Sequence, residues 1–208
     1  NKSGIWSSKE EVNLKKKQFS SFETVNTEVE TFNQIINPEN NLKVLLDPVK
    51  LNIVWNNKYF NNTNKEVNFS YKDLNNVVTQ SKKLIKKKAN KNLLYKNNII
   101  TISNDKGDII FYSTTAEEIK FKFNFYKKNF KRIPKVLYYA LENNILYIGD
   151  NLGYLYALNI DKKKLIWAKN YKVPFRSNLK ILKNKLLISD INNSLYLINK
   201  MNGEKIKI

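Results

Sequence analysis

One strand–turn–strand pattern occurs three times in this 208-residue chain, and it restricts the fold more than any other feature. The copies span residues 99–112, 145–158 and 186–198, each with two runs of alternating apolar residues around a turn of Asp, Asn or Gly. Alternation with a period of two is typical of strands and not of helices. The turn residues Gly107 and Gly153 align with Asn193, and asparagine is the next-best residue where a turn needs a positive φ.

The sequences that flank each copy repeat as well. An apolar strand precedes the copies at residues 93–95, 136–141 and 179–182, and a fourth strand follows at 119–125, 164–169 and from 205 onward. Four antiparallel strands every 40–46 residues or so match the period of β-propeller blades. We therefore predict an all-β fold, an incomplete β-propeller of about three four-stranded antiparallel blades at residues 92–126, 136–169 and 178–208.

Residues 1–48 differ from the rest and are predicted to form a polar tail with one short amphipathic helix. Ser20 or Ser21 is a suitable N-cap and Pro38 lies just past the end. The helix would bury a stripe at three- and four-residue spacing made of Phe22, Val25, Val29, Phe32 and Ile36. Residues 49–208 then form the partial propeller. Because the chain starts at Asn1 and stops within a strand-like run, we expect a fragment of a longer protein.

Residues 51–60 are predicted to hold a closing strand. Leu51-Asn-Ile-Val-Trp55 resembles the fourth strand of a blade, which ends at Trp167 in the second copy. In closed propellers an N-terminal strand commonly completes the last blade and removes a sheet edge. We expect its partner strands to follow Ile208; an edge strand packed locally is the alternative.

The net charge of +19 arises entirely in residues 51–208, because seven lysines balance seven acids in residues 1–50. A basic surface suits nucleic acid, anionic lipid or an acidic protein. Arg132 and Arg176 are the only arginines, whereas readers of nucleic acid favour arginine. Abundant Lys, Asn and Ile indicate an AT-rich genome instead, so no nucleic-acid partner is expected. We interpret the lysine cluster at residues 82–91 as a solvated loop, with an anionic surface as the alternative.

Several kinds of chemistry are excluded by composition. The chain has no cysteine and no histidine, which removes disulfides, thiolate chemistry, Cys/His zinc sites and histidine acid–base catalysis. Asp105, Asp150 and Asp190 recur at one blade position and are expected to be turn residues, not metal ligands. No pair of carboxylates is set apart for acid–base work. We predict no catalytic residue, no cofactor site and no metal site.

Residues 153–167 resemble the repeat of the quinoprotein-like (PQQ-type) propellers, which reads G-x-L-Y-A-L-D/N, a T-G-K turn, an aliphatic pair and Trp. Lys163 stands where that family prefers glycine, the third copy has Gly203 there, and the first copy lacks its Trp. Within this superfamily the order of parts is similar to that of the BamB family of lipoproteins. The similar segments are the opening residues 1–6 and the connector at residues 170–178.

The resemblance to BamB implies an eight-bladed, non-enzymatic scaffold at the periplasmic face of the bacterial outer membrane. Such a scaffold docks on the barrel-forming subunit of the assembly machinery and assists insertion of nascent outer-membrane β-barrel proteins. A lipid anchor would lie upstream of Asn1. Arg176, in a blade connector, is our candidate protein contact; a hydrogen bond between blades is its alternative. The competing class is a fragment of a PQQ-dependent dehydrogenase-like quinoprotein, for which Trp6, Trp55 and Trp167 would have to form the quinone floor. We expect Trp55 and Trp167, which end outer strands, to pack between blades instead.

Overall fold

The computed structural model describes residues 37, 39–43, 45–50, 54–65, 67–68, 80–86, 88–126, 130 and 132–207. The chain divides into two units, Asn1–Leu45 and Leu46–Ile208. In the first unit the Leu42 N–H donates to the Glu39 carbonyl at 2.9 Å and closes a turn; the helix predicted within residues 22–36 lies outside the described residues. No helix in the described part of the chain is both long and apolar enough to cross a membrane.

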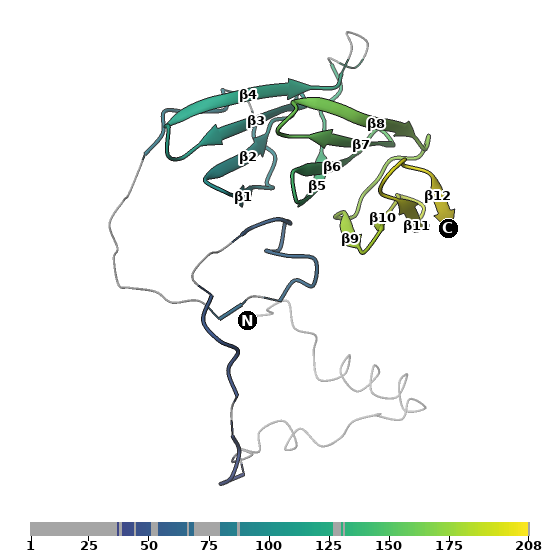
Figure 1. Cartoon of the computed structure of the whole chain (residues 1–208). Coiled ribbons are helices and arrows are strands. Elements are labelled where there is room, and N and C mark those ends of the chain that lie inside the picture. The colour runs from purple at the N-terminus through teal and green to yellow at the C-terminus, as the bar shows by residue number, and fades with distance from the viewer. Residues whose placement is uncertain are drawn as a thin grey trace, which may run out of the picture. The chain divides into compact units, whose positions relative to one another are not determined.

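The second unit contains three four-stranded antiparallel sheets, each with its strands in sequence order (Figure 1). Blade 1 comprises β1 (Leu94–Lys96), β2 (Ile99–Ser103), β3 (Asp108–Ser113) and β4 (Glu118–Asn124). Blade 2 comprises β5 (Leu137–Glu142), β6 (Ile145–Asp150), β7 (Tyr154–Asn159) and β8 (Lys164–Asn170). Blade 3 comprises β9 (Lys180–Leu182), β10 (Lys185–Ser189), β11 (Leu195–Asn199) and β12 (Lys205–Lys207). The predicted incomplete propeller is confirmed; the total of eight blades stays a prediction.

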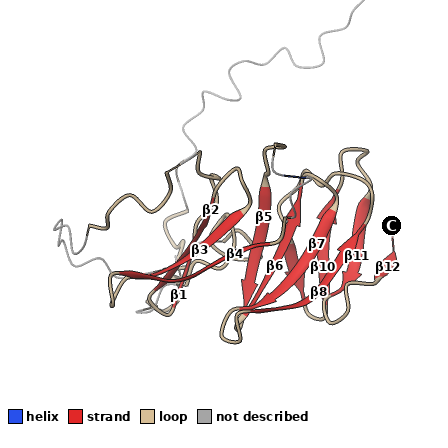
Figure 2. Ribbon diagram, turned by 90° about the horizontal axis from the view of Figure 1, so that it is seen from above, coloured by secondary structure: helices blue, strands red, loops and turns tan. Residues whose placement is uncertain are grey.

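The alternation of apolar residues places one core on each face of blade 2, because successive side chains of a strand point to opposite faces. Leu146 and Ile148 of β6 belong to the core shared with blade 1. Tyr147, between them, belongs to the core shared with blade 3. Each fully buried aliphatic side chain in these cores stabilises the fold by about 1.5–3 kcal/mol. Strands of blades 2 and 3 consequently stand side by side (Figure 2).

The turns that join the second and third strands of the blades have the backbone conformation that the alignment predicts. Gly107, Gly153 and Asn193 have φ angles of +82°, +87° and +65°. The turns before the outer strands also agree between blades, with φ of +52° at Lys163 and +70° at Gly203. Lys163, which aligns with a glycine of the family repeat, therefore has the positive φ that glycine adopts most easily.

The first strand of each blade is its inner strand and the last is its outer strand. In blade 3, Phe175 pairs with Asp190 and Lys180 pairs with Leu187, so that four residues face two across a bulge. Blade 1 has the same bulge at residues 90–93, between the pairs Ala89–Asn104 and Leu94–Thr101. Blade 2 pairs without interruption from Leu137 to Glu142. Bulges of this kind re-aim side chains, and Arg176 lies in one of them.

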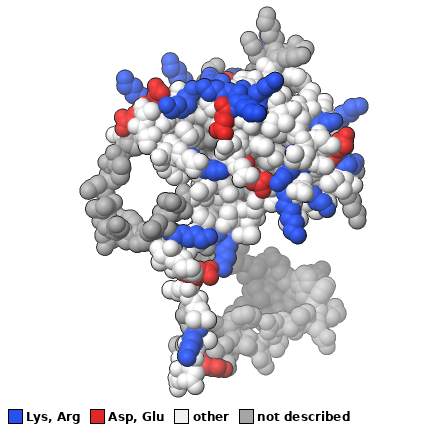
Figure 3. Space-filling model, in the orientation of Figure 1, with Lys and Arg blue, Asp and Glu red and all other residues white. Residues whose placement is uncertain are grey.

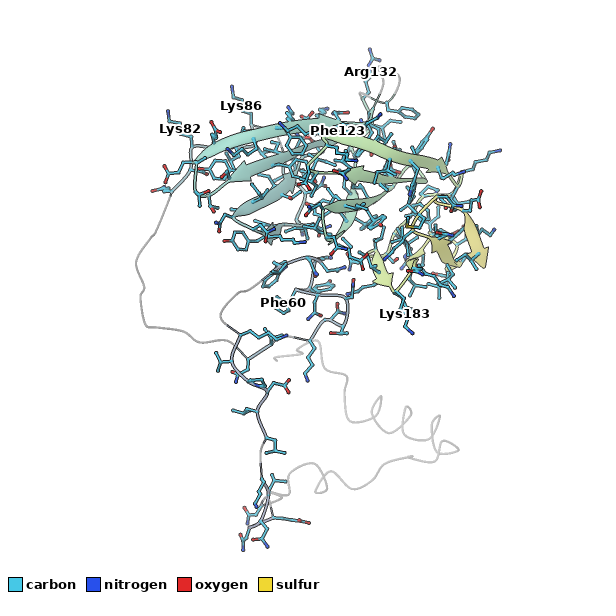
Figure 4. The ribbon with its side chains drawn as sticks, viewed as in Figure 1. Phe60, Lys82, Lys86, Phe123, Arg132 and Lys183 are labelled. Atoms are coloured by element: carbon cyan, nitrogen blue, oxygen red, sulfur yellow. The ribbon has the colours of Figure 1, made fainter. Side chains whose placement is uncertain are left out.

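Residues 54–65, which we call the axial segment, contact the inner strands of all three blades. Trp55 and Tyr95 of β1 exchange backbone hydrogen bonds of 2.8 Å, and the Leu141 N–H of β5 donates to the Asn56 carbonyl at 2.8 Å. At blade 3 the Ile181 N–H donates to the Asn62 side chain at 3.1 Å. Figure 4 shows Phe60 of this segment beside the inner strands.

These contacts differ from the predicted closing strand. Trp55 pairs with the inner strand of blade 1, not with strands after Ile208, and it is not on an outer strand. The pairing of residues 51–53 lies outside the described residues. The difference has a physical reason, because an aliphatic run ending in Trp fits the edge of an inner strand as well as that of an outer one.

Candidate docking rim

The blade connectors and the turns between second and third strands meet at one edge of the propeller, which we call the connector rim. Its described residues are 125–126, 130, 132–136 and 171–179 together with the turns at 104–107, 150–153 and 190–194. Backbone hydrogen bonds fasten each connector to these turns. The Lys135 N–H donates to the Asp105 carbonyl at 2.8 Å, and the Phe175 N–H donates to the Asp150 carbonyl at 3.2 Å.

The carboxylates of the rim turns hold the turns together. The Asp150 carboxylate accepts hydrogen bonds from the N–H groups of Leu152 and Tyr154 at 2.9 and 2.8 Å. Asp190 accepts in the same way from the N–H groups two and four residues later, at 2.8 and 3.0 Å. The expectation that these two are turn residues is confirmed, and these bonds leave them little capacity to bind a metal.

The equivalent residue in blade 1 is Asn104 and not Asp105, so the prediction that Asp105 shares the position of Asp150 and Asp190 is wrong, although the alignment of Gly107 with Gly153 holds. The Asn104 side-chain oxygen accepts from the N–H groups of Lys106 and Asp108 at 2.9 and 3.0 Å. Asp105 uses its backbone instead, since its N–H donates to the Lys88 carbonyl at 2.9 Å. Asn and Asp form such turns equally well, so residue type alone could not distinguish the two neighbours.

A buried polar cluster joins blades 1 and 2 beneath the rim. The Tyr126 hydroxyl donates to the Asp150 carboxylate at 2.7 Å, and Lys135, 1% exposed, donates to the Phe130 carbonyl. Burial raises the pKa of Asp150, although its hydrogen bonds lower it in part. Burial also lowers the pKa of the Lys135 ammonium. Burying a charge costs free energy unless it is paired, so removal of the Tyr126 hydroxyl is expected to destabilise this contact between the connector and blade 2.

The corresponding carboxylate of blade 3, Asp190, has its pKa shifted in the opposite direction. At Asp190 burial again raises the pKa, but hydrogen bonds from the Tyr196 hydroxyl and from two backbone N–H groups outweigh it, so the pKa is lowered overall. The Tyr196 hydroxyl lies 2.9 Å from the carboxylate. Asp150 and Asp190 thus occupy the same position in their blades, and their pKa values are shifted in opposite directions.

The exposed side chains of the connector rim are basic and apolar. Lys172, Arg132 and Arg176 are exposed, whereas Asp150 and Asp190 are 0% and 1% exposed. Three large aliphatic side chains are also exposed on the rim, Ile133 at 42%, Val136 at 42% and Ile191 at 52%. Arg132 projects away from the blades (Figure 4), and basic side chains also gather along the edge where β4 and β8 lie (Figure 1), at the top of Figure 3. Sequence reasoning missed these aliphatic residues, because nothing local distinguishes an exposed isoleucine in a connector from a core one.

Arg176, the predicted protein contact, lies on this rim within the bulge of blade 3. Its backbone N–H donates to the Ser189 carbonyl at 3.0 Å. Its guanidinium is exposed and lies 3.5 Å from the side-chain oxygen of Asn193, in the same blade. Its positive charge lowers the pKa of Tyr138 on β5, which burial raises by more. The guanidinium thus lies near blade 2 while most of its donors remain free to bind a partner.

Trp167 packs between blades, as expected. It joins the core between blades 2 and 3, and its indole N–H donates to the Lys200 carbonyl of blade 3 at 3.0 Å. No group of three or more acidic residues that could hold a metal ion occurs in the described ranges. The described rim exposes two arginine guanidinium groups and three aliphatic side chains, which are groups suited to contacts with another protein.

Three antiparallel four-stranded blades, packed face to face around an axial segment, define this protein as an incomplete β-propeller. No protein-family model matches the chain. Over 112 residues, 53% of the chain, it is 28% identical to the tRNA (guanine-N(7)-)-methyltransferase non-catalytic subunit of Candida glabrata, of which the match covers 27%. The chain thus spans about a quarter of that relative.

Two solved structures are similar to about half of this chain. BamB from Moraxella catarrhalis is 13% identical, with a TM-score of 0.46 over 55% of this chain and 33% of BamB. A europium-containing methanol dehydrogenase is also 13% identical, with a TM-score of 0.46 over 55% of this chain and 23% of the enzyme. The assignment of the fold rests on the blade geometry described above.

Proposed function

We propose that this chain is part of a non-enzymatic propeller scaffold that binds another protein through its connector rim, as BamB-like lipoproteins do. The partner would be the barrel-forming subunit of the outer-membrane assembly machinery, with nascent barrel proteins as the cargo. The repeat pattern at residues 153–167 and the connector at 170–178 support the BamB-like part of this proposal.

One observation carries the docking role. Arginines and aliphatic side chains are exposed together on the connector rim, while the buried carboxylates of Asp150 and Asp190 accept hydrogen bonds from the backbone. Binding hot spots are enriched in arginine and are surrounded by apolar contacts that exclude water. Charges of one sign also attract a complementary partner and orient it.

Binding to the isolated periplasmic domains of the barrel-forming subunit tests the proposal. We expect Arg176→Ala to weaken binding by about tenfold or more, the range of a hot-spot residue. Lys183→Ala, in the turn at the opposite end of blade 3 (Figure 4), is the matched control and should bind as the wild type does. Absence of binding by the unaltered chain would remove the docking function, whereas an unaffected Arg176→Ala variant would remove only that residue.

Localisation is part of the proposal. We expect the protein at the periplasmic face of the outer membrane, held by a lipid on a cysteine upstream of Asn1. The gene sequence upstream of the codon for Asn1 tests this, since it should encode a signal peptide that ends in a lipobox cysteine. A cytosolic reading frame continuing upstream without a signal peptide would contradict it.

The curated match favours a second candidate, a non-catalytic subunit that supports an RNA-modifying enzyme. Both candidates are scaffolds, so the partner distinguishes them. If tRNA binds this chain and competes with the periplasmic domains for it, the second candidate is favoured. If this chain were part of a quinoprotein dehydrogenase, it would bind pyrroloquinoline quinone. We expect no such binding.

A further inference from the structure

Residues 80–86, which we call the seam segment, lie against the face of blade 1 that points away from blade 2. Ile109 and Phe111 of β3 pack on blade 2, so the alternate residues Ile110 and Tyr112 point the other way. These two are nevertheless only 3% and 4% exposed. Leu84 of the seam segment lines a cavity of about 400 Å³ together with Tyr112 and Ile119.

The seam segment runs in the direction of an outer strand. Leu84 is beside the first residues of β4, and the Lys88 carbonyl, a few residues later, accepts from the Asp105 N–H in the turn between β2 and β3. Figure 4 shows Lys82 and Lys86 projecting outward beside β4. β8 has the equivalent relation to blade 3, since it comes just before the bridge between Phe175 and Asp190 and before β9.

The sequence of the seam segment is that of an outer strand too. Lys83-Leu84-Ile85 repeats Lys164-Leu165-Ile166, with which β8 begins. Leu84 and Ile85 are half-buried, whereas the lysines at 82, 83 and 86 are exposed. A solvated loop would not explain why Leu84 lies beside blade 1 and is half-buried while the neighbouring lysines are exposed.

The seam segment differs from β8 because no strand pairs with it among the residues that the structure describes. β8 pairs with β7 along its whole length, from Asn159–Lys164 to Tyr154–Asn170. No backbone hydrogen bond joins residues 80–86 to any other described residue. Ile100 and Ile102 pair with Tyr112 and Ile110, so they share the same face of blade 1, and they are half-buried. Leu93, just before β1, is 46% exposed. A partly exposed apolar sheet face and an extended segment without backbone pairing to the described residues therefore belong to the same side of blade 1.

We propose that the seam segment is the outer strand of a further blade, and that it binds a three-stranded antiparallel sheet of the same repeat. The third strand of that sheet pairs with residues 80–86 as β7 pairs with β8. Its face covers the exposed aliphatic residues of blade 1. The ring-closing role predicted for Leu51–Trp55 thus falls to residues 80–86, because Trp55 is already paired with Tyr95.

A capture experiment tests the proposal with a defined probe. The full chain is co-expressed with a tagged second polypeptide made of residues 134–160, which contains β5 to β7 but no fourth strand. We expect the two to purify together in equal amounts. The double variant L84D/I85D should reduce capture at least tenfold, because two charges would replace the aliphatic contacts.

The control is L195D, which places a carboxylate on the exposed face of blade 3 and should leave capture unchanged. Circular dichroism and the unfolding midpoint verify that both variants fold like the wild type. Hydrogen exchange provides a second readout, since the amides of residues 82–86 should become protected in the complex. The proposal is overturned by lack of capture, by capture that survives L84D/I85D, or by capture that only L195D abolishes.

Discussion

The indole ring of Trp167 lies over Gly203, and a β-carbon at position 203 would be 2.7 Å from the ring atom Cε3. Trp167 belongs to the outer strand of blade 2, whereas Gly203 lies in the last turn of blade 3. Gly203 also has a φ of +70°. The contact therefore couples two blades through a residue that has to lack a side chain for two separate reasons.

Gly203→Ala is expected to lower the free energy of unfolding by about 2–4 kcal/mol. About 1 kcal/mol comes from the positive φ, and the remainder from displacing a packed indole ring. Denaturant unfolding followed by tryptophan fluorescence measures the change. Asn193→Gly is the matched control, because it relieves a positive φ in the turn of the same blade and should not destabilise. Equal stability of wild type and Gly203→Ala would contradict the proposed contact.

Asn57→Ala is expected to destabilise the protein by about 1–3 kcal/mol, because it leaves a buried carbonyl without its donor. The Asn57 amide is 0% exposed and donates to the Leu179 carbonyl at 2.9 Å. Asn192→Ala, an exposed asparagine in a rim turn, should change stability by less than about 0.5 kcal/mol. Hydrogen exchange adds a local test: the amides of β9 should lose protection in Asn57→Ala before those of β6 do.

The effects of Asp150→Asn and Asp190→Asn on the free energy of unfolding, each relative to wild type, should depend on pH in opposite ways. Asn104 shows that asparagine can form the same turn. The pKa of Asp150 is raised above its ordinary value of 3.8, so its contribution to stability is present below that value and is lost as the pH rises through the raised pKa. The pKa of Asp190 is lowered, so its contribution is present above the ordinary value and is lost as the pH falls through the lowered pKa.

Urea unfolding at about pH 7 and about pH 3 measures both effects. Relative to wild type, Asp190→Asn should be less stable at the higher pH, and the difference should shrink at the lower one. The Asp150→Asn variant should compare most favourably with wild type at the higher pH and lose that advantage at the lower one. If the free energy of unfolding depended on pH in the same way in both variants, the pKa values of Asp150 and Asp190 would not be shifted in opposite directions.

Leu195→Asp is expected to reduce self-association of the isolated chain. Leu195 is 52% exposed, although its equivalent in blade 2, Leu155, is 0% exposed within the core shared with blade 3. Exposed apolar sheet faces favour association. Sedimentation velocity over a range of protein concentrations should show a smaller shift to larger species than for wild type. Met201→Asp, a change at a 70% exposed turn residue, should leave the association unaltered.

The hairpins could be predicted from the sequence because their information is local. Alternating apolar residues fix which face of each strand is buried, and the turn residues fix the register, so Gly107, Gly153 and Asn193 aligned correctly. The place of Trp55 could not be predicted, because its partner Tyr95 is 40 positions away by their numbers and nothing near Trp55 specifies it. The rim could be predicted only in part. Arg176 was apparent as a rare residue in a connector, whereas Ile133 and Val136 resemble core residues until the fold is known.

The hydrogen bond between Asn57 and Leu179 joins residues separated by 122 positions, which has a consequence for folding during synthesis. At about 5–20 residues per second, a ribosome adds the partner of Asn57 roughly 6–24 s after Asn57 itself. Blades 1 and 2 can form within that delay, because their contacts are between neighbours in sequence. The axial segment can pair with β1 and β5 during that delay, whereas its hydrogen bonds to blade 3 have to wait until Leu179 and Ile181 emerge. The attachment of blade 3 to the axial segment is therefore expected to be the late step by which the nascent chain becomes a propeller.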